Sequence, residues 1–382
     1  MTAPHPALIQ LVVSGEAGPI EDEGTFLQSV HEHRMTAPVL TAYQRQALRL
    51  SPASATTLGI WDLAERRQHL LFWKAIQEVQ DRLAPTGAEV AVLKGVATEA
   101  RWYGEIGQRV STDVDLLLAP DALDGAAKLV ATIDKRRGVS SAIDWLVRQR
   151  LLQHVDLHVG PVHVDLHFDP LKIGIPTHQL DEVWDSTQLF PTPHGMIRVL
   201  RPEIELVLLL LHLNKDSFAF LGSYLDIRQI VARAALDWDY VRSFVAGEGL
   251  EVPVFKSLAA VTELLGLDLD VPRTHGVRAW CWERLWGRAT RPGGHDSRMR
   301  APTAQRFLAF HASGRTRATV REVRRQLLPA RQLLEVAGRL EPGRSYVRYL
   351  SVDRFRRRSR SASPDGTVFP TDVVDYDANV GG

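Results

Sequence analysis

The sequence has almost no cysteine, no long hydrophobic run and no recognisable leader. Its single cysteine, Cys281, cannot form a disulfide within the chain, and no Cys-x-x-Cys pair offers a zinc knuckle. The longest apolar run, Leu206–Leu213, is interrupted by His212 and is far too short to span a bilayer. The first residues lack the basic and then apolar pattern of a signal peptide. These absences exclude a disulfide scaffold and a membrane protein, and they predict a soluble protein of the reducing cytoplasm.

The chain has almost no net charge. The 382 residues include 46 basic and 45 acidic side chains, for a net charge of +1, and only seven of the basic ones are lysines. The net charge is therefore too small to attract nucleic acid or an anionic membrane electrostatically. With 45% hydrophobic residues the chain can bury a sizeable core, which excludes a mostly disordered chain. Its length is typical of two or three domains.

Helical patterns occupy both ends of the chain. Residues 1–84 predict a helical N-terminal segment, in which the period over 58–83 indicates a long helix with one buried stripe. That stripe consists of Leu63, Leu70, Leu71, Trp73, Ile76, Val79 and Leu83. Residues 201–350 predict a helical C-terminal domain, and residues 351–382 predict a poorly ordered tail that is first basic and then acidic. The helices expected there cover 203–213, 224–235, 254–265, 277–286, 303–312 and 318–340.

Between these helical parts, residues 85–200 alternate strand and helix patterns. The short apolar run Glu89–Leu93 predicts a buried strand, and a helical stretch follows over Val96–Tyr103. Asp113–Leu118 predicts a second strand, and Asp121–Ile133 a second helix. This strand–helix–strand–helix order predicts a catalytic core that combines a sheet with helices.

A repeated pentapeptide predicts a hairpin. His154–His158 recurs as His163–His167, and each copy alternates polar and apolar residues as half-buried strands do. If Gly160 and Pro161 form a two-residue turn, Asp156 lies opposite Asp165 on the neighbouring strand. Two facing carboxylates repel each other unless a cation or a proton lies between them.

The most informative motif is the Asp-x-Asp pair at the start of the second strand. Asp113 and Asp115 are two residues apart, so both carboxylates project from the same face. A divalent metal would balance their charges, and Mg²⁺, with Mn²⁺ as the alternative, prefers oxygen ligands of this kind. Asp165 is the candidate third carboxylate, which would allow an in-line phosphoryl displacement. The competing interpretation is that the motif merely caps a turn.

Cationic and small residues near this motif favour a phosphate site. Lys94 and Gly95 lie at a strand-to-helix turn, where backbone N–H groups attract anions and glycine permits close approach. Arg109 lies four residues before Asp113, and Ser111 lies two residues before it. The motif and its surroundings therefore predict a metal and a phosphorylated ligand at one site.

At these residues the chain resembles a known family. The segments Val92-Leu-Lys-Gly-Val96, Asp113-Val-Asp-Leu-Leu117 and Val164-Asp-Leu-His167, together with Tyr103 and Arg109, resemble the uncharacterised nucleotidyltransferase family of the DNA polymerase β-like superfamily. The resemblance covers roughly residues 60–350 and is most specific over 92–118 and 162–168. One departure is that Lys94-Gly95 stands where the superfamily more often has Gly-Ser.

The resemblance implies a fold and a reaction. The fold is α+β, with a polymerase β-like mixed-sheet core, a helical N-terminal segment and a helical C-terminal domain. The reaction is Mg²⁺-dependent transfer of a nucleoside monophosphate from an NTP, ATP first, to a hydroxyl or phosphate of a small molecule or peptide, with release of pyrophosphate. An RNA acceptor is disfavoured, because no aromatic and basic module accompanies the site.

The resemblance also implies roles for individual residues. Asp113, Asp115 and Asp165 are the expected catalytic metal ligands, with Asp165 as the third ligand or the base. The phosphate-binding candidates are Lys94, Gly95, Arg109 and Ser111. His167, Lys215 and Asp226 are candidates for contacts to the acceptor or for support behind the metal ligands.

Three other interpretations remain open from the sequence. A phosphotransferase that moves the γ-phosphate could use the same carboxylates. A non-catalytic, antitoxin-like binding module could keep the same fold. The four histidines of the hairpin could instead hold Zn²⁺ in a metallohydrolase, although strand histidines are more often simple polar surface residues. Those histidines are His154, His158, His163 and His167.

Overall fold

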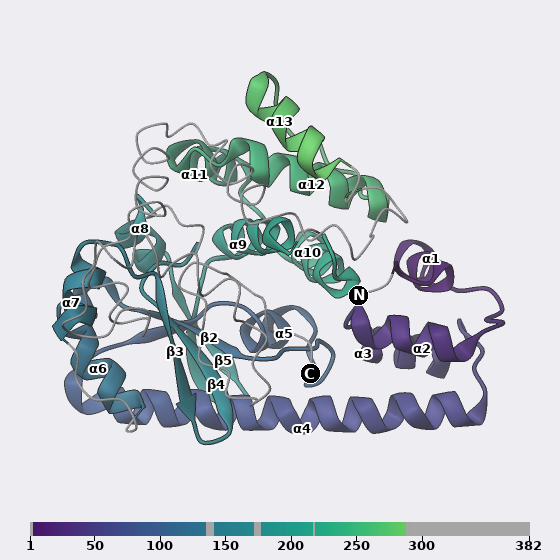
Figure 1. The fold of residues 1–382 in the computed structure, drawn as a ribbon, viewed down its shortest axis with the longest axis horizontal. Coiled ribbons are helices and arrows are strands. Elements are labelled where there is room, and N and C mark those ends of the chain that lie inside the picture. Colours follow the sequence, from purple (N-terminus) through teal and green to yellow (C-terminus); the bar gives the residue numbers. More distant parts are fainter. Residues whose placement is uncertain (1–2, 135–140, 172–176, 217, 288–289, 291–382) are drawn as a thin grey trace, which may run out of the picture.

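One mixed six-stranded sheet forms the centre of the protein, and helices gather around it (Figure 1). The computed structural model describes residues 3–134, 141–171, 177–216, 218–287 and 290. The strands are β1 (Val90–Val92), β2 (Val114–Leu118), β3 (His154–Val159), β4 (Val162–His167), β5 (Gln188–Thr192) and β6 (Gly195–Val199). Their order is β3-β4-β2-β1-β6-β5, in which β2 runs parallel to β4 and β1 parallel to β6. The predicted α+β class with a mixed sheet is confirmed.

Helices make up most of the remaining described chain. The α-helices are α1 (Pro6–Ser14), α2 (Glu23–Glu32), α3 (Thr36–Gln44), α4 (Pro52–Leu83), α5 (Val96–Trp102), α6 (Ala126–Ile133), α7 (Ser141–Arg148), α8 (Leu180–Asp185), α9 (Pro202–Lys215), α10 (Leu221–Arg233), α11 (Trp238–Glu248), α12 (Glu251–Leu265) and α13 (Val277–Trp286). In Figure 1, α1–α3 lie at one end of the molecule, and α4 extends from them along one side to α6. Among the described helices, none combines the length and apolar character that crossing a membrane requires.

The long helix α4 corrects one part of the sequence prediction. It begins six residues earlier than expected, at Pro52, because the side chain of Ser51 accepts a hydrogen bond from the backbone of Ser54. The predicted stripe is right at Trp73 and Ile76, which are buried, but wrong at two leucines. Leu63 and Leu70 are 70% and 51% exposed.

Polar side chains take the place of those leucines on the buried face of α4. His69 is buried there, and its Nδ1 lies 2.5 Å from Oε2 of Glu99 on α5. Asp62 is buried two turns earlier and accepts a hydrogen bond from Arg66 at 2.7 Å. The hydrophobic period therefore indicated the wrong face only around Leu63 and Leu70, because the middle of α4 packs against a polar network.

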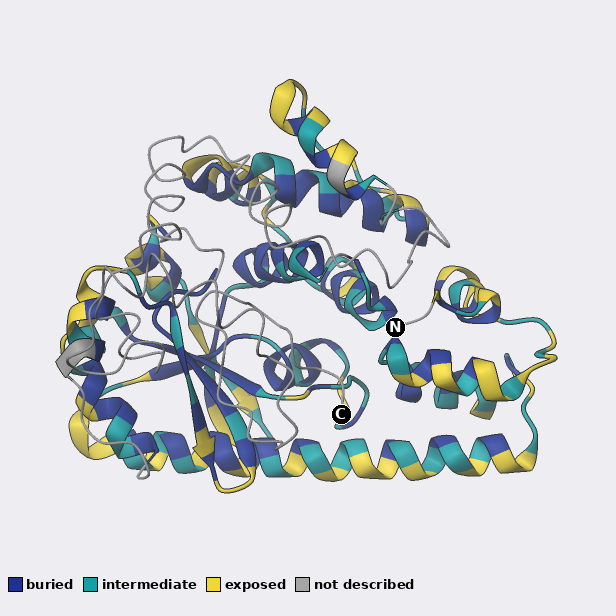
Figure 2. Ribbon diagram, in the orientation of Figure 1, coloured by how far each residue is buried: buried dark blue, intermediate teal, exposed yellow. Residues whose placement is uncertain are grey.

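The buried hydrophobic side chains form two cores. One core contains the C-terminal half of α4, the strands β1–β4 and the helices α6 and α7, with Ile76 and Leu157 among its buried members. The other contains α1–α3 and α9–α12, with Leu210 and Phe244 among its members. Helix α9 is buried over almost its whole length (Figure 2), which explains why it has a nearly continuous apolar run.

The predicted hairpin is confirmed in detail. β3 and β4 are antiparallel, Val159 pairs with Val162, and Asp156 lies opposite Asp165. The two-residue turn sets this register, and Gly160 has the positive φ of 60° that such a turn needs. A second hairpin, β5–β6, was not predicted, and it extends the sheet beyond β1.

Some helix predictions need correction or lie outside the described residues. The helix expected over 121–133 is a 3-10 helix over Pro120–Gly125 followed by the shorter α6. Helix α11 was not predicted. The helices expected over 303–312 and 318–340, and the tail over 351–382, lie outside the described residues.

Candidate active site

Three aspartates form a row across neighbouring strands. Asp115 on β2 is in register with Asp165 on the parallel strand β4, and Asp165 is in register with Asp156 on β3. Side chains at paired positions project from the same face of a sheet. Asp113 directly precedes β2 and is half-buried, whereas Asp115 and Asp165 are buried. The sequence spacing and the strand pairing thus bring the three predicted carboxylates, Asp113, Asp115 and Asp165, to one face of the sheet, where Asp156 continues the row.

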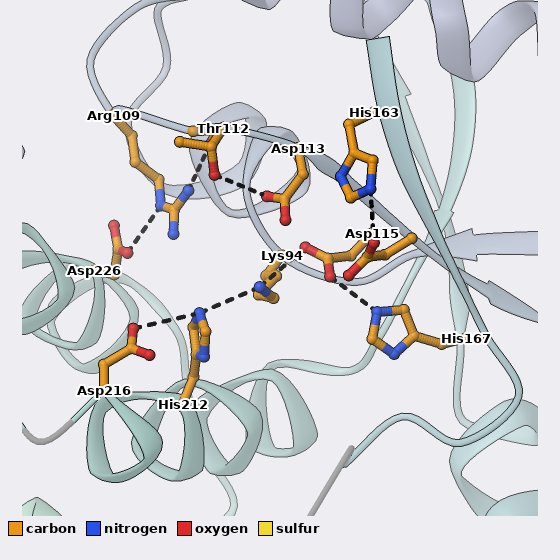
Figure 3. Close-up of polar contacts among 12 residues, drawn as sticks. Lys94, Arg109, Thr112, Asp113, Asp115, His163, His167, His212, Asp216 and Asp226 are labelled. Atoms are coloured by element: carbon orange, nitrogen blue, oxygen red, sulfur yellow. Dashed lines mark hydrogen bonds and ion pairs between the residues drawn. The ribbon is translucent and has the colours of Figure 1, made fainter. Parts of the chain in front are cut away.

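The Asp115 carboxylate lies between a cation and an imidazole (Figure 3). Nζ of Lys94 is 3.0 Å from Oδ2 of Asp115. On the other side, Nε2 of His167 lies 2.9 Å from Oδ1, and since a carboxylate only accepts, the imidazole donates. Asp115 is therefore charge-balanced by Lys94, whose side chain comes from the turn after β1.

His212 on α9 supports Lys94 from the helical side. Its Nε2 lies 3.2 Å from Nζ of Lys94 and 3.7 Å from Oδ2 of Asp216 (Figure 3). Burial lowers the pKa of His212 well below its usual value, and the charges of Lys94 and Lys215 lower it further. A neutral imidazole accepts a hydrogen bond from the ammonium, so His212 orients Lys94 without competing with it for Asp115.

Arg109 is fixed by a second network on the other side of the site. Its Nε donates to Asp226 on α10 at 2.8 Å, and its Nη1 donates to the Ser111 hydroxyl at 2.6 Å. The hydroxyl of Tyr103 donates to the other oxygen of Asp226 at 2.8 Å. Burial alone would lower the pKa of Arg109, but the attraction of Asp226 outweighs it and raises the pKa. Arg109 thus presents a permanent positive charge in a defined place.

Gly95 lets the backbone approach this network closely. Its φ of 64° and ψ of −113° lie in a region that is almost restricted to glycine. A Cβ there would lie 3.2 Å from the Ser111 hydroxyl oxygen. The turn after β1 therefore requires glycine for its conformation and also for the space beside Ser111.

Histidine and carboxylate atoms in the site could hold a metal ion. Among the described residues, three groups have one donor atom from each member within 4.8 Å of the others: Asp113, His163 and Asp165; Asp115, Asp165 and His167; and His154, Asp156 and Asp165. Asp165 belongs to all three, and none of the three contains both Asp113 and Asp115. The donor set fits a divalent ion, because oxygen and imidazole donors are those that Mg²⁺, Mn²⁺ and Zn²⁺ use.

The structure brings the predicted site residues to one place. The two networks and the group of carboxylates described above contain nine of these residues: Lys94, Gly95, Arg109, Ser111, Asp113, Asp115, Asp165, His167 and Asp226. Lys215 lies at the end of α9, close enough for its charge to act on His212. Of the four hairpin histidines, His158 belongs to none of the three candidate metal groups.

Sequence reasoning missed two basic side chains near the site. His212 appeared in the sequence only as an interruption of an apolar run. Arg34, between α2 and α3, has a positive φ of 60°, and its Cζ lies 4.0 Å from the centre of the Phe220 ring. Burial lowers the pKa of Arg34, and the charges that act on it include those of Asp216, Arg109 and Asp113. The positive φ of Arg34, which is unusual for a residue other than glycine, marks it as a candidate functional residue, and this signal is visible only in the structure.

The corner that presents Arg34 is held by the helices opposite. The backbone N–H of Gly222 donates to the carbonyl of His33 at 3.1 Å, and Nδ1 of His33 donates to the carbonyl of Ala219 at 2.9 Å. These contacts place the strained residue over the start of α10 and hold it there.

Comparison with known proteins gives one match. Residues 19–266 match the model of a protein family described as an uncharacterised nucleotidyltransferase. No curated protein and no solved structure matches the chain. The matched segment contains the carboxylate row, both cationic networks and Arg34.

Proposed function

The chain belongs to the uncharacterised nucleotidyltransferase family, and we propose that it transfers a nucleoside monophosphate from an NTP to a hydroxyl or phosphate of a small molecule or peptide. ATP is the donor we propose first. The observation that supports this most strongly is the pairing of Asp115 with Asp165 on parallel strands, with Asp113 two residues before Asp115. Such a row of carboxylates beside fixed cations suits a triphosphate and a divalent ion.

The carboxylates of Asp113, Asp115 and Asp165 would hold the metal, as Mg²⁺ or Mn²⁺. Asp165 shares one candidate metal group with Asp113 and another with Asp115. When bound, a divalent ion at this place neutralises phosphate oxygens and lowers the pKa of an attacking hydroxyl. The buried position of Asp115 and Asp165 favours this role, because paired buried carboxylates are costly without a cation.

The cationic side chains would bind and orient the triphosphate. Arg109 is held by Asp226, and Lys94 is held by His212, so both charges are already in position before a ligand arrives. The hydroxyl of Ser111 and the close backbone at Gly95 would complete the phosphate contacts. Fixed charges of this kind lower the barrier to transfer, since they need no rearrangement during the reaction.

In the proposed reaction the acceptor oxygen forms a bond to the α-phosphorus. The bond from that phosphorus to the bridging oxygen breaks, and pyrophosphate leaves with the electron pair. Asp165, which shares one candidate metal group with Asp113 and another with Asp115, takes the proton of the acceptor hydroxyl. We assign His167 and Asp226 to positioning, through Asp115 and Arg109 respectively, and Lys215 to the acceptor side at the end of α9.

A thermal-shift experiment with ATP, GTP, CTP and UTP tests the proposal. We expect one nucleotide to raise the unfolding temperature in the presence of Mg²⁺ or Mn²⁺, because a ligand that binds the folded state stabilises it. Asp115→Asn should abolish that increase. Asp239→Asn is the matched control, since this carboxylate on α11 is exposed and pairs with Arg242 on the same helix. If no nucleotide shifts the transition of the wild type, the nucleotidyltransferase assignment is wrong.

Labelled ATP then identifies the phosphate that moves. Label from the α-phosphate should appear on the acceptor, with release of pyrophosphate. Transfer of the γ-label would instead show a phosphotransferase that uses the same site. A nucleotide-dependent shift without turnover of either label would indicate a binding module.

A further inference from the structure

One of the three candidate metal groups contains a carboxylate whose two oxygens both accept hydrogen bonds. In the group of Asp115, Asp165 and His167, both oxygens of Asp115 accept hydrogen bonds: Oδ1 from His167 at 2.9 Å and Oδ2 from Lys94 at 3.0 Å. A metal ion that binds Asp115 there would have to displace either the ammonium from Oδ2 or the imidazole N–H from Oδ1. This inner group is therefore a poor first position for a divalent ion.

The outer group, Asp113, His163 and Asp165, lies two residues back along the same strands. Val114 pairs with Val164 and Asp115 with Asp165, so Asp113 and His163 are the next neighbours in this parallel register. Their donor atoms and that of Asp165 all lie within 4.8 Å of one another. Nε2 of His163 is 3.7 Å from Oδ1 of Asp165. Ligands around one ion with bonds of about 2.1 Å are about 3 Å apart when adjacent and about 4 Å apart when opposite, so this spacing suits a shared ion.

We propose that the resident metal binds at the outer group with Nε2 of His163 as a ligand, and that this nitrogen makes the site prefer Mn²⁺ to Mg²⁺. Imidazole is a good donor to first-row transition metals, whereas Mg²⁺ prefers oxygen and water. His163 is 41% exposed at its side chain, so solvent can satisfy its other ring nitrogen. The inference rests on the proposed function only in expecting that the site takes a divalent ion.

Electron spin echo spectroscopy of Mn²⁺ bound to the full-length chain tests the ligand directly. We expect modulation from a bound ¹⁴N nucleus in the wild type and its loss in His163→Asn. His158→Asn is the matched control, because His158 pairs with His163 across the hairpin and belongs to none of the three groups. It should keep the nitrogen signal.

Two spectroscopic outcomes overturn the proposal. The first is a wild-type spectrum without nitrogen coupling, which would mean that only oxygen atoms bind the ion. The second is a signal that persists in His163→Asn and disappears in His167→Asn, which would place the ion at the inner group. Because the wild-type spectrum alone decides the first outcome, the test does not depend on the folding of any variant.

Metal titrations by calorimetry test the preference. His163→Asn should weaken Mn²⁺ binding at least tenfold and change Mg²⁺ binding by less than about threefold. An equal loss for the two metals, or tighter binding of Mg²⁺ by the wild type, contradicts the proposal. Neither measurement uses nucleotide turnover. A nitrogen signal without nucleotide transfer would count against the proposed function alone, and transfer without a nitrogen signal against the metal ligand alone.

Discussion

At the scale of single residues, Asp226 organises half of the candidate site. One of its oxygens accepts a hydrogen bond from Nε of Arg109, and the other accepts one from the hydroxyl of Tyr103. A single carboxylate thus orients the guanidinium of Arg109. Burial raises the pKa of the Tyr103 hydroxyl well above its usual value, and the nearby Asp226 charge raises it further, so this hydroxyl stays a donor. The position of the cation thus depends on a residue that need not touch the ligand itself.

Asp226→Asn should weaken nucleotide binding while leaving the fold intact. A hydrogen bond to a charged group contributes about 1.5–3 kcal/mol, and each 1.4 kcal/mol is about tenfold, so we expect roughly a tenfold loss of affinity or more. Calorimetric titration with the nucleotide identified above measures it. Asp239→Asn on α11 should bind like the wild type, and an unchanged affinity in Asp226→Asn would show that Arg109 does not contact the nucleotide.

Gly95→Ala should lower both stability and nucleotide affinity. The residue would have to keep a φ of 64°, and its Cβ would lie 3.2 Å from the Ser111 oxygen. We expect a loss of about 1–3 kcal/mol in the free energy of unfolding, measured with urea. Gly59→Ala provides the comparison, since a Cβ on this α4 glycine would meet no atom within 4 Å. That variant should gain about 0.5–1 kcal/mol, and a similar gain in Gly95→Ala would refute the strained turn.

At the scale of elements, the long helix α4 connects the two cores and changes character along its length. Leu58 belongs to the core of the N-terminal helices, whereas Phe72, Ile76 and Val79 belong to the core beneath the sheet. Between them the buried face is polar, with His69 against Glu99 of α5. The same Glu99 accepts the backbone N–H of Arg109 at 3.0 Å, so α4 supports the loop that enters β2.

Substitutions on α4 should separate its two faces. Leu63→Gln removes an exposed side chain and should change the free energy of unfolding by no more than about 0.5 kcal/mol. Ile76→Ala creates a cavity in a fully buried position and should cost about 2–5 kcal/mol. Urea denaturation of both variants measures the difference, and a large loss in Leu63→Gln would restore the stripe that the sequence period predicts.

Short-range patterns allowed part of this architecture to be predicted, and long-range packing determined the rest. The β3–β4 register follows from a two-residue turn, and the shared face of Asp113 and Asp115 follows from the strand period, so both could be read from local sequence. The face of α4 depends on a distant partner, Glu99. Arg34 and His212 reach the site only through the docking of α2–α3 and α9, which no local pattern encodes.

At the scale of the whole molecule, the site lies where the sheet meets the helical layer. A buried ion pair joins the two parts there: Nη1 of Arg101 on α5 lies 2.6 Å from Oε2 of Glu205 on α9. Thr98 and Trp102 also donate to Glu205, at 2.7 and 3.1 Å. Burial raises the pKa of Glu205 despite these partners. The contacts of Glu205 with three side chains of α5 thus hold α9 at a fixed distance from the carboxylates of the sheet.

The free energy of unfolding should fall as the pH rises from 5 to 8. Burial, with the charges of Asp62 and Glu99, raises the pKa of Glu65 from 4.5 to about 7 in the folded protein. The folded state therefore binds more protons in this range than the unfolded state, and the stabilisation present below pH 4.5 is lost as the pH passes 7. Because Glu65 is only half-buried, we expect an effect on the order of 1 kcal/mol.

Glu65→Gln should reduce this dependence in urea denaturation at pH 5, 6, 7 and 8, while Glu248, whose pKa burial also raises to about 7, keeps the remainder. Glu65 accepts a hydrogen bond from Thr36 at 2.7 Å, and a glutamine oxygen can accept the same bond. Glu21→Gln, in the exposed loop before α2, should leave the slope of the wild type unchanged. If the slope in Glu65→Gln equals that of the wild type, other groups determine the pH dependence.

The contact between Lys94 and Asp115 makes cation binding at this carboxylate an exchange and not a simple addition. A divalent ion can reach Oδ2 of Asp115 only as the ammonium, 3.0 Å away, gives it up. An anion that attracts Lys94 lowers the cost of that exchange, and by reciprocity a cation at Asp115 makes Lys94 more available to the anion. The lysine therefore links the occupancy of two neighbouring positions, so that each ligand increases the affinity for the other. Selectivity for the pair follows even if neither ligand is bound strongly alone.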